Sequence, residues 1–340
     1  MLKKLCTLAF FVFCLILSGG EKYSVLVFGD THYDSMDVRT APPVSDHHKT
    51  EMNRNLTAWK ENMPFLIKTA AEKCNSTADF AVQLGDLTQG DCGSQELQEK
   101  SFRSVLSIFQ SALKIPFYTV KGNHDIRGRG ANAAYNAVML PYMSKALNQP
   151  IPKNNAANFA VMHKGDLYIY FDCMKFDAKF VYDALKKHPD ARYVFLLTHI
   201  PVLPGYNFAG ISPKPKTHQN FRKVLAKHNV IVLSAHVHVT TFIRYKTDEG
   251  RIAQVINYSL PINRQRQPSV IEENIFELYK KVDRPNNLAA IKPLFEQYLE
   301  GFTYYKAVAG FNVLNVSDEG VFIDLYTGEM KAPFKTIKLR

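Results

Sequence analysis

Five short apolar segments, each followed by a side chain that can bind a metal, constrain the fold of this chain more than any other feature. They are YSVLVFGD (23–30), DFAVQLGD (79–86), PFYTVKGN (116–123), YVFLLTH (193–199) and VIVLSAH (230–236). Short apolar runs rich in β-branched residues predict buried strands. Between several of these runs the spacing of apolar residues predicts helices, over 52–74, 97–113, 178–187 and 221–228. Strands that alternate with helices indicate an α/β core.

Two further stretches predict antiparallel hairpins at the border of this core. NFAVMHKGDLYIYFD (158–172) turns at 164–166, and FNVLNVSDEGVFIDLY (311–326) turns at 318–320. We therefore expect two packed sheets in one domain over 21–340. Helical spacing on both sides of DRPNN predicts a helical insertion at about 268–300.

The polar residues after the five predicted strands share one property, which is the ability to bind a metal. They occur in GDTH, GDLTQG, GNHD, THIP and AHVH, and the candidates are Asp30, His32, Asp86, Asn123, His199, His236 and His238. Each alone could be a turn, cap or core residue. Together they are poorly explained by packing, because ligands of open α/β sheets collect at the carboxyl ends of the strands. Imidazole and carboxylate ligands suit manganese, iron, zinc or nickel, and no set of cysteines demands zinc.

These five blocks, in this order, resemble those of the calcineurin-like metallophosphoesterase superfamily, from residue 24 to about 260. One departure is Ala235, where the family usually has glycine. The resemblance implies a four-layer αββα sandwich, with two mixed β-sheets flanked by helices, and two metal ions. By the same resemblance, one metal has the ligands Asp30, His32 and His238. The second has Asn123, His199 and His236, and Asp86 bridges the two.

The resemblance also implies an activity, the hydrolysis of phosphodiesters or phosphomonoesters by a hydroxide that bridges two metal ions. His124 then corresponds to the histidine that protonates the leaving oxygen or steadies the phosphoryl group, and we expect Asp125 to orient its ring. Arg127 either reaches a substrate phosphate or is a solvated loop residue. Gln89 stands where purple acid phosphatases have a tyrosine, which disfavours a ferric-tyrosinate site.

Other functions stay open at this stage. A nucleotide pyrophosphatase or a cyclic-nucleotide phosphodiesterase could use the same residues, and a catalytically inactive metal-bound scaffold belongs to another class of protein. The expected partner is a small-molecule phosphoester. No specific nucleic acid is expected, because the basic stretches lack interleaved aromatic residues. The sequence specifies neither the natural substrate nor the oligomeric state.

The first twenty residues predict export. Lys3 and Lys4 precede an apolar run that ends in small residues, the order found in a signal peptide (1–20), and no later segment is apolar enough to span a bilayer. We therefore expect a secreted or periplasmic protein, and the alternative is that the segment stays uncleaved as an N-terminal anchor. Without the two lysines the formal net charge falls from +11 to +9. Of the remaining cysteines, Cys74 and Cys92 could form a disulfide in an oxidising compartment.

Overall fold

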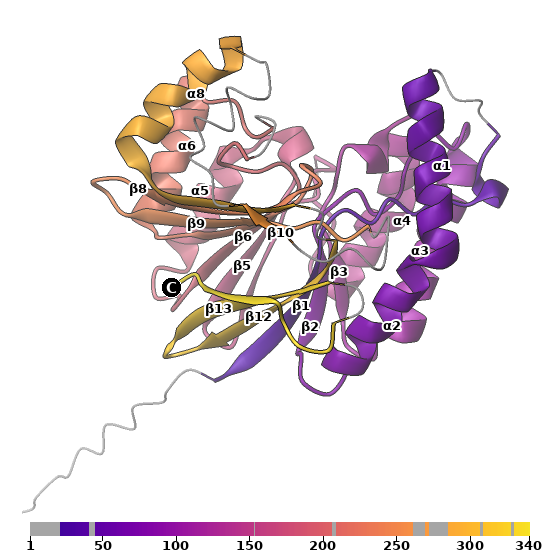
Figure 1. The fold of residues 1–340 in the computed structure, drawn as a ribbon, viewed down its shortest axis with the longest axis horizontal. Helices are drawn as coiled ribbons and strands as arrows, with labels where there is room; N and C mark the ends of the chain where they lie inside the picture. Colours follow the sequence, from indigo (N-terminus) through magenta and orange to yellow (C-terminus); the bar gives the residue numbers. More distant parts are fainter. Residues whose placement is uncertain are drawn as a thin grey trace, which may run out of the picture.

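Two mixed β-sheets lie between two layers of helices (Figure 1). The structure is a computed structural model that describes residues 21–40, 45–152, 154–205, 209–260, 269–271, 285–306, 309–327 and 330–340. One sheet has six strands and the other has eight, and seven helices flank them within the described residues. The α/β class and the αββα layers that the resemblance implied are confirmed.

The six-stranded sheet carries the first three predicted strands side by side. Its order is β14 (Lys335–Lys338), β13 (Gly320–Thr327), β12 (Gly310–Ser317), β1 (Tyr23–Phe28), β2 (Phe80–Gln83) and β3 (Phe117–Thr119). The strands β1, β2 and β3 are parallel, and the other pairs in this sheet are antiparallel. The carboxyl ends of β1, β2 and β3 therefore meet at one edge.

The eight-stranded sheet contains the other two of the five predicted strands. Its order is β10 (Ser269–Ile271), β11 (Leu299–Lys306), β8 (Thr240–Lys246), β9 (Arg251–Ile256), β7 (Ile231–Ser234), β6 (Val194–Thr198), β5 (Asp166–Phe171) and β4 (Phe159–His163). Its central strands β5, β6, β7 and β9 are parallel. The remaining pairs are antiparallel, including the predicted hairpin of β4 and β5.

The helices divide between the outer faces of the two sheets (Figure 1). On the six-stranded sheet lie α1 (Asp46–Glu61), α2 (Met63–Cys74), α3 (Gln95–Ala112) and α4 (Ala131–Ala146), where α2 contacts β12 and α4 contacts β3. On the eight-stranded sheet lie α5 (Ala178–Lys187), α6 (Lys216–Lys227) and α8 (Pro285–Tyr298). Short 3₁₀ turns occur at η1 (Met36–Val38), η2 (His124–Ile126) and η3 (Cys173–Lys175).

Strand β5 shows how the sequence pattern produces these layers. All six of its residues are buried, because both faces of the strand are covered. Tyr168 and Tyr170 belong to the core between the two sheets, whereas Ile169 and Phe171 belong to the core beneath the outer helices. On that outer side Phe171 stacks on Phe221 of α6. Successive side chains of a strand point to opposite faces, so a continuous apolar run supplies two cores at once.

The structure divides one predicted helix and adds another. The helix predicted over 52–74 is two helices that meet at Asn62, because Pro64 at the start of α2 has no N–H to donate and favours a helix start. Helix α4 was not predicted. Its apolar residues do not form one stripe, and Pro141 lies inside it.

The remaining expectations fall partly outside the described residues. Within the predicted insertion at 268–300, residues 269–271 form β10 and 285–298 form α8, whereas 272–284 are outside the described residues, as is the predicted signal peptide. Cys74 and Cys92 are free thiols, so the disulfide considered above is not present. Burial raises the pKa of each to about 12. No described helix is long and apolar enough to cross a membrane.

Candidate metal centre

The seven predicted metal ligands lie together where the two sheets meet. They follow the carboxyl ends of β1, β2 and β3 in one sheet and of β6 and β7 in the other. Donor atoms of six of them form two groups, each within 4.8 Å: one has Asp30, His32, Asp86 and His238, and the other has Asp86, His199 and His236. Asp86 belongs to both groups, which is the position that a bridging carboxylate takes.

In the first group, the Nε2 atoms of the two histidines lie close to each other and to the two carboxylates. The Nε2 atoms of His32 and His238 are 3.0 Å apart. Nε2 of His238 is 3.7 Å from Oδ1 of Asp30, and Nε2 of His32 is 3.8 Å from Oδ2 of Asp86. The ring of His238 also stacks on Tyr258, with centroids 5.0 Å apart. This stacking fixes the orientation of His238.

The second group surrounds His199, which is fully buried. Its Nε2 atom is 3.2 Å from Oδ2 of Asp86 and 3.1 Å from Nδ1 of His236. Oδ1 of Asn123 lies 3.1 Å from the same nitrogen, so Asn123 joins this group through an oxygen. Nδ1 of His199 lies 2.9 Å from the main-chain oxygen of Leu84. That contact leaves Nε2 to face the other members of the group.

Four of these residues have a backbone conformation that is unusual for a side chain with a Cβ atom. The φ angles are 45° at His32, 54° at Asp86, 73° at His236 and 58° at His238. A non-glycine residue in this region costs roughly 1–3 kcal/mol, and such residues gather at active sites. Gly85 (φ 89°) lies against the ring of His199, where a Cβ atom would come within 2.7 Å of Nδ1. These backbone conformations and the close approach at Gly85 thus belong to the loops that carry the candidate ligands.

The charges in the centre are strongly coupled. Burial acts to raise the pKa of Asp86, but the neighbouring histidines, led by His199, outweigh it and hold the pKa well below its usual value. Burial acts to lower the pKa of His199, but the adjoining carboxylates of Asp86 and Asp30 raise it to about 9. Burial lowers the pKa of His236 to about 4 and of His238 to about 3. These two imidazoles are therefore neutral near pH 7, the form that binds metal.

The donor atoms fit a pair of metal ions. In each group two imidazole nitrogens point at each other beside a carboxylate, and a cation between them would serve all of these donors. The buried Nδ1 atom of His32 has no hydrogen-bond partner. Neutral imidazoles, carboxylates and one amide oxygen match borderline divalent metals.

His124 lies beside the centre and contacts it through the backbone. Its N–H donates to Oδ1 of Asp86 at 2.7 Å. Nδ1 of its ring lies 2.9 Å from the main-chain oxygen of Gln89, so Nδ1 carries the proton of the neutral ring. Nε2 then accepts from Nη1 of Arg127, 3.1 Å away. The main-chain oxygen of Gln89 therefore orients the ring.

Asp125 does not have the role expected from the sequence. Its carboxylate accepts the N–H groups of Thr88 (3.0 Å) and Gly122 (2.9 Å), and the Thr88 hydroxyl lies 3.3 Å away. None of these contacts is to the ring of His124. Because Thr88 follows Asp86 closely and Gly122 precedes Asn123, Asp125 ties together two loops that carry candidate ligands.

Arg127 also has partners that its sequence position did not indicate. Its Nε and Nη2 atoms pair with Asp91 and Glu51, and Nη1 is the atom that contacts His124. Each nitrogen of the guanidinium thus has one partner within the protein, and the side chain is 31% exposed. Arg127 is therefore a held residue beside the centre, and its second Nη hydrogens are not used by these contacts.

Sequence reasoning missed the contribution of α1 to the centre. Glu51 accepts from Nε2 of Gln89, Asn55 donates to Oε1 of Gln89, and Trp59 donates to the main-chain oxygen of Thr31. The spacing of 51, 55 and 59 along one helix face could have indicated a shared role. Between them, Arg54 has a buried Nη2 atom with no hydrogen-bond partner. The positive charge of Arg54 also lowers the pKa of His32 and of His238. In both cases burial is the largest cause of the shift, and the charge of Arg54 adds a smaller contribution.

Comparisons with solved structures agree with the fold described above. No curated protein sequence matches the chain. Its fold is similar to that of a purple acid phosphatase from yellow lupin (Lupinus luteus) seeds, with a TM-score of 0.57, 11% identity and coverage of 94% of this chain but only 54% of that one. It is also similar to a dimetal phosphatase from Danio rerio, with a TM-score of 0.54, 10% identity and coverage of 93% of this chain and 98% of that one. A third similar fold is that of GAP50, the anchor in the inner membrane complex of Plasmodium, with a TM-score of 0.52, 13% identity and coverage of 93% of this chain and 88% of that one. At these identities the likeness shows the fold alone.

The match to a family is more specific than the likeness of folds. The sequence profile of the calcineurin-like phosphoesterases matches residues 23–240, a stretch that contains every candidate metal ligand. That stretch makes up more than half of the 340 residues. The chain therefore belongs to the calcineurin-like phosphoesterase family.

Proposed function

We propose that this chain, whose family supports metal-dependent hydrolysis of phosphoesters, uses two metal ions to cleave phosphomonoesters or phosphodiesters. The observation that carries the proposal is the position of Asp86, a buried carboxylate that belongs to two adjacent groups of candidate ligands. Asp30, His32 and His238 would hold one ion, and Asn123, His199 and His236 the other. Metal ions held there would supply activation of water and neutralisation of phosphoryl charge, and manganese, iron, zinc or nickel suits these donors.

His124 is proposed to act on the substrate rather than on a metal. Because Nδ1 donates to the main-chain oxygen of Gln89, Nε2 is the ring atom that can exchange a proton with substrate. Only the protonated ring carries a proton at Nε2 as well; that proton would pass to the leaving oxygen and leave the neutral ring with its proton at Nδ1. In the arrangement described, Nη1 of Arg127 occupies this position. Substrate must therefore either replace this contact or share it.

Arg54 is proposed to bind the phosphate as well as Arg127. Its Nη2 atom is buried without a partner, and its Nε atom is held by Oδ1 of Asn55 at 3.1 Å. The contribution of its charge to the pKa values of His32 and His238 indicates that it lies near the first group of ligands. A guanidinium in that position can donate two parallel hydrogen bonds to a phosphate.

A substrate panel on metal-reconstituted protein tests the proposal. Release of p-nitrophenol from p-nitrophenyl phosphate reports a monoesterase, and release from bis-p-nitrophenyl phosphate reports a diesterase. Cyclic nucleotides and dinucleotides in the same panel separate the cyclic-nucleotide phosphodiesterase and pyrophosphatase alternatives. We expect hydrolysis that requires added metal. A chain that binds metal yet cleaves no member of the panel would instead be a non-catalytic scaffold.

We also propose that the protein is exported, with residues 1–20 removed as a signal peptide. The support is the order of basic, apolar and small residues in the sequence. Expression of the full chain followed by N-terminal sequencing of the exported product tests it. A new N-terminus near Glu21 is expected, and an intracellular chain that keeps Met1 would contradict export.

A further inference from the structure

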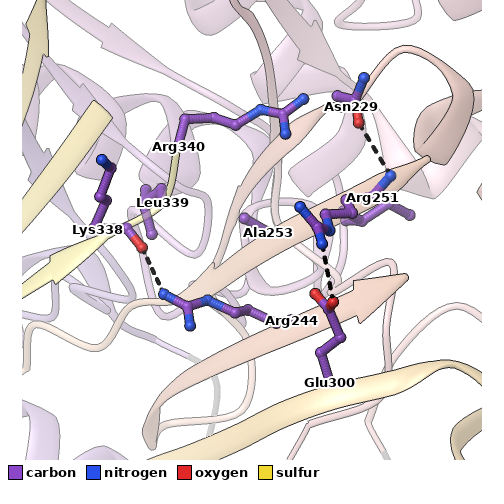
Figure 2. A pocket seen from close by; sticks show the side chains of 9 residues that line it. Asn229, Arg244, Arg251, Ala253, Glu300, Lys338, Leu339 and Arg340 are labelled. Atoms are coloured by element: carbon purple, nitrogen blue, oxygen red, sulfur yellow. Dashed lines mark hydrogen bonds and ion pairs between the residues drawn. The ribbon is translucent and has the colours of Figure 1, made fainter. Parts of the chain in front are cut away.

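A second group of charged side chains lies in a pocket away from the metal centre (Figure 2). The pocket has a volume of about 490 Å³, and its charged lining residues are Arg244, Arg251, Glu300, Lys338 and Arg340. Strand β8 begins at Thr240, beside His238, and Arg244 lies four residues further along. At about 3.4 Å per residue, that separation is about 14 Å along the strand. The pocket is thus distinct from the candidate catalytic site.

Both sheets contribute positive charge to this pocket. Arg244 and Arg251 come from β8 and β9, whereas Lys338 ends β14 of the other sheet and Arg340 follows it. Nη2 of Arg244 donates to the main-chain oxygen of Lys338 at 3.0 Å, which links the two sheets across the pocket (Figure 2). This bond uses only one nitrogen of the guanidinium, so the remaining donors of Arg244 are not consumed by it.

Carboxylate side chains among the lining residues balance only part of this positive charge. Among the lining residues only Glu300 is acidic, and it pairs with Arg251 at 3.3 Å. Four basic side chains and one acidic side chain give the lining a formal charge of +3. Two acids of the adjacent turns 247–250 and 317–320 have other partners: Asp318 pairs with Arg192 at 2.6 Å, and Glu249 lies 3.8 Å from Lys223. Asp248 and Glu319 lie in the same two turns and are not lining residues of the pocket.

The arginines of the pocket also act on one another. Partial burial lowers the pKa of Arg340, and the charge of Arg251 lowers it further. Like charges held in one concave surface repel, so an anion that enters the pocket relieves this repulsion. Arginine is suited to phosphate, because its planar guanidinium matches two phosphate oxygens at once.

We propose that this pocket binds a phosphate-bearing anion. It is rich in hydrogen-bond donors, and its size is that of a small-molecule site rather than of a single phosphate group. An inorganic polyphosphate and a phosphorylated small molecule share this chemistry. This site needs neither the metal ions nor the reaction proposed above.

Isothermal titration of the full chain tests the proposal. Tripolyphosphate is the probe in one arm and glycerol 2-phosphate in the other, with chelator present so that bound metal does not contribute. Circular dichroism first establishes that the chelated chain is folded. Saturable binding of at least one probe is expected, weakening as salt is raised. The arm with the tighter binding identifies the source of the phosphate.

A double variant, Arg244→Gln with Arg340→Gln, locates the binding. Loss of two guanidinium contacts should weaken affinity by about tenfold or more. The matched control is Arg103→Gln on α3, an arginine that is 65% exposed and distant in sequence; it should bind as the parent chain does. Hydrolysis by the metal-loaded double variant should be unchanged. Equal affinity in the parent and the double variant, or no binding of either probe by the parent, would overturn the proposal.

A second measurement serves if the chelated chain unfolds. Metal-loaded protein is titrated with methylenediphosphonate, which can bind at the metals and in the pocket. The parent should then show two kinds of binding site and the double variant one. A single kind of site in both proteins would likewise overturn the proposal.

Discussion

The Nη1 atom of Arg127 lies 3.1 Å from Nε2 of His124, the ring atom that faces away from the main-chain contact of that histidine. Glu51 and Asp91 hold the same guanidinium from the other side. A cation is thus fixed against a histidine that lies beside the candidate metal ligands and is not one of them. This contact is one of the interactions that set the proton affinity of His124.

The first prediction concerns that affinity. Burial lowers the pKa of His124, Asp86 opposes this, and the charge of Arg127 lowers the pKa further. Arg127→Gln should therefore raise the pKa of His124, and the release of Glu51 from its partner acts in the same direction. An NMR titration of the His124 ring measures the change. Arg129→Gln removes the same charge at an exposed position two residues away and should have little effect. An unchanged titration in the Arg127 variant would show that Arg127 does not control this proton.

The second prediction concerns the shared carboxylate. Asp86→Asn should reduce metal content in both groups, because Asp86 is common to them. The loss of affinity should exceed the roughly 10–100-fold typical of residues that only support a ligand. Metal analysis after dialysis measures it, with Asp183→Asn, an exposed carboxylate on α5, as the control. Full occupancy in the Asp86 variant would rule out a bridging role.

The third prediction concerns the stability of the loops. Asp125→Ala leaves the buried N–H groups of Thr88 and Gly122 without an acceptor. At about 1–3 kcal/mol for each unsatisfied group, the free energy of unfolding should fall by about 2–6 kcal/mol. Asp125→Asn keeps one acceptor oxygen and should lose less. Chemical denaturation measures both, and Asp183→Ala is the exposed control. Equal stability of all variants would mean that Asp125 does not hold the two loops together.

The fourth prediction concerns pH. In the metal-free protein the pKa of His199 is raised to about 9, so the ring holds a proton at pH 7 that a metal must displace. Metal affinity should therefore increase as pH rises toward 9 and level off above it. Calorimetry in buffers of different ionisation enthalpy should detect release of about one proton or more for each metal bound near His199. Affinity that is independent of pH, without proton release, would contradict the charge assigned to His199.

The fifth prediction separates Arg54 from the metal ligands. Arg54→Gln should lower kcat/KM for a phosphoester by roughly 10–100-fold, the equivalent of one charge-assisted hydrogen bond. Metal content should stay at the level of the parent chain, because Arg54 is not a candidate ligand. Inhibition by inorganic phosphate should weaken in parallel. An unchanged kcat/KM and unchanged phosphate inhibition would remove Arg54 from substrate binding, and Arg103→Gln again controls for loss of charge.

The candidate ligands could be predicted from the sequence because each depends on local order. An apolar run predicts a strand, and the residue after it must lie at the carboxyl end of that strand. Asp30 and Asp86 were found in this way, since the parallel pairing of β1 and β2 brings their ends to one edge. His199 and His236 follow the parallel strands β6 and β7 of the other sheet in the same way, but only the packing of the two sheets brings the two edges together. The two-core pattern of β5 is equally local, because it follows from the alternation of side chains along one strand.

The partners of these residues depended on the tertiary structure. Glu51 and Arg127 are 76 positions apart, and their ion pair exists only because α1 packs over the loop that follows β3. The tertiary structure also brings the main-chain oxygen of Gln89 to the ring of His124. It places the carboxylate of Asp125 against the N–H groups of Thr88 and Gly122. Residue type and spacing predict which side chains can bind metal, because a residue's place at the end of a strand follows from the few residues before it. They do not report which charges meet across the fold, because the contacts of many distant segments decide that together.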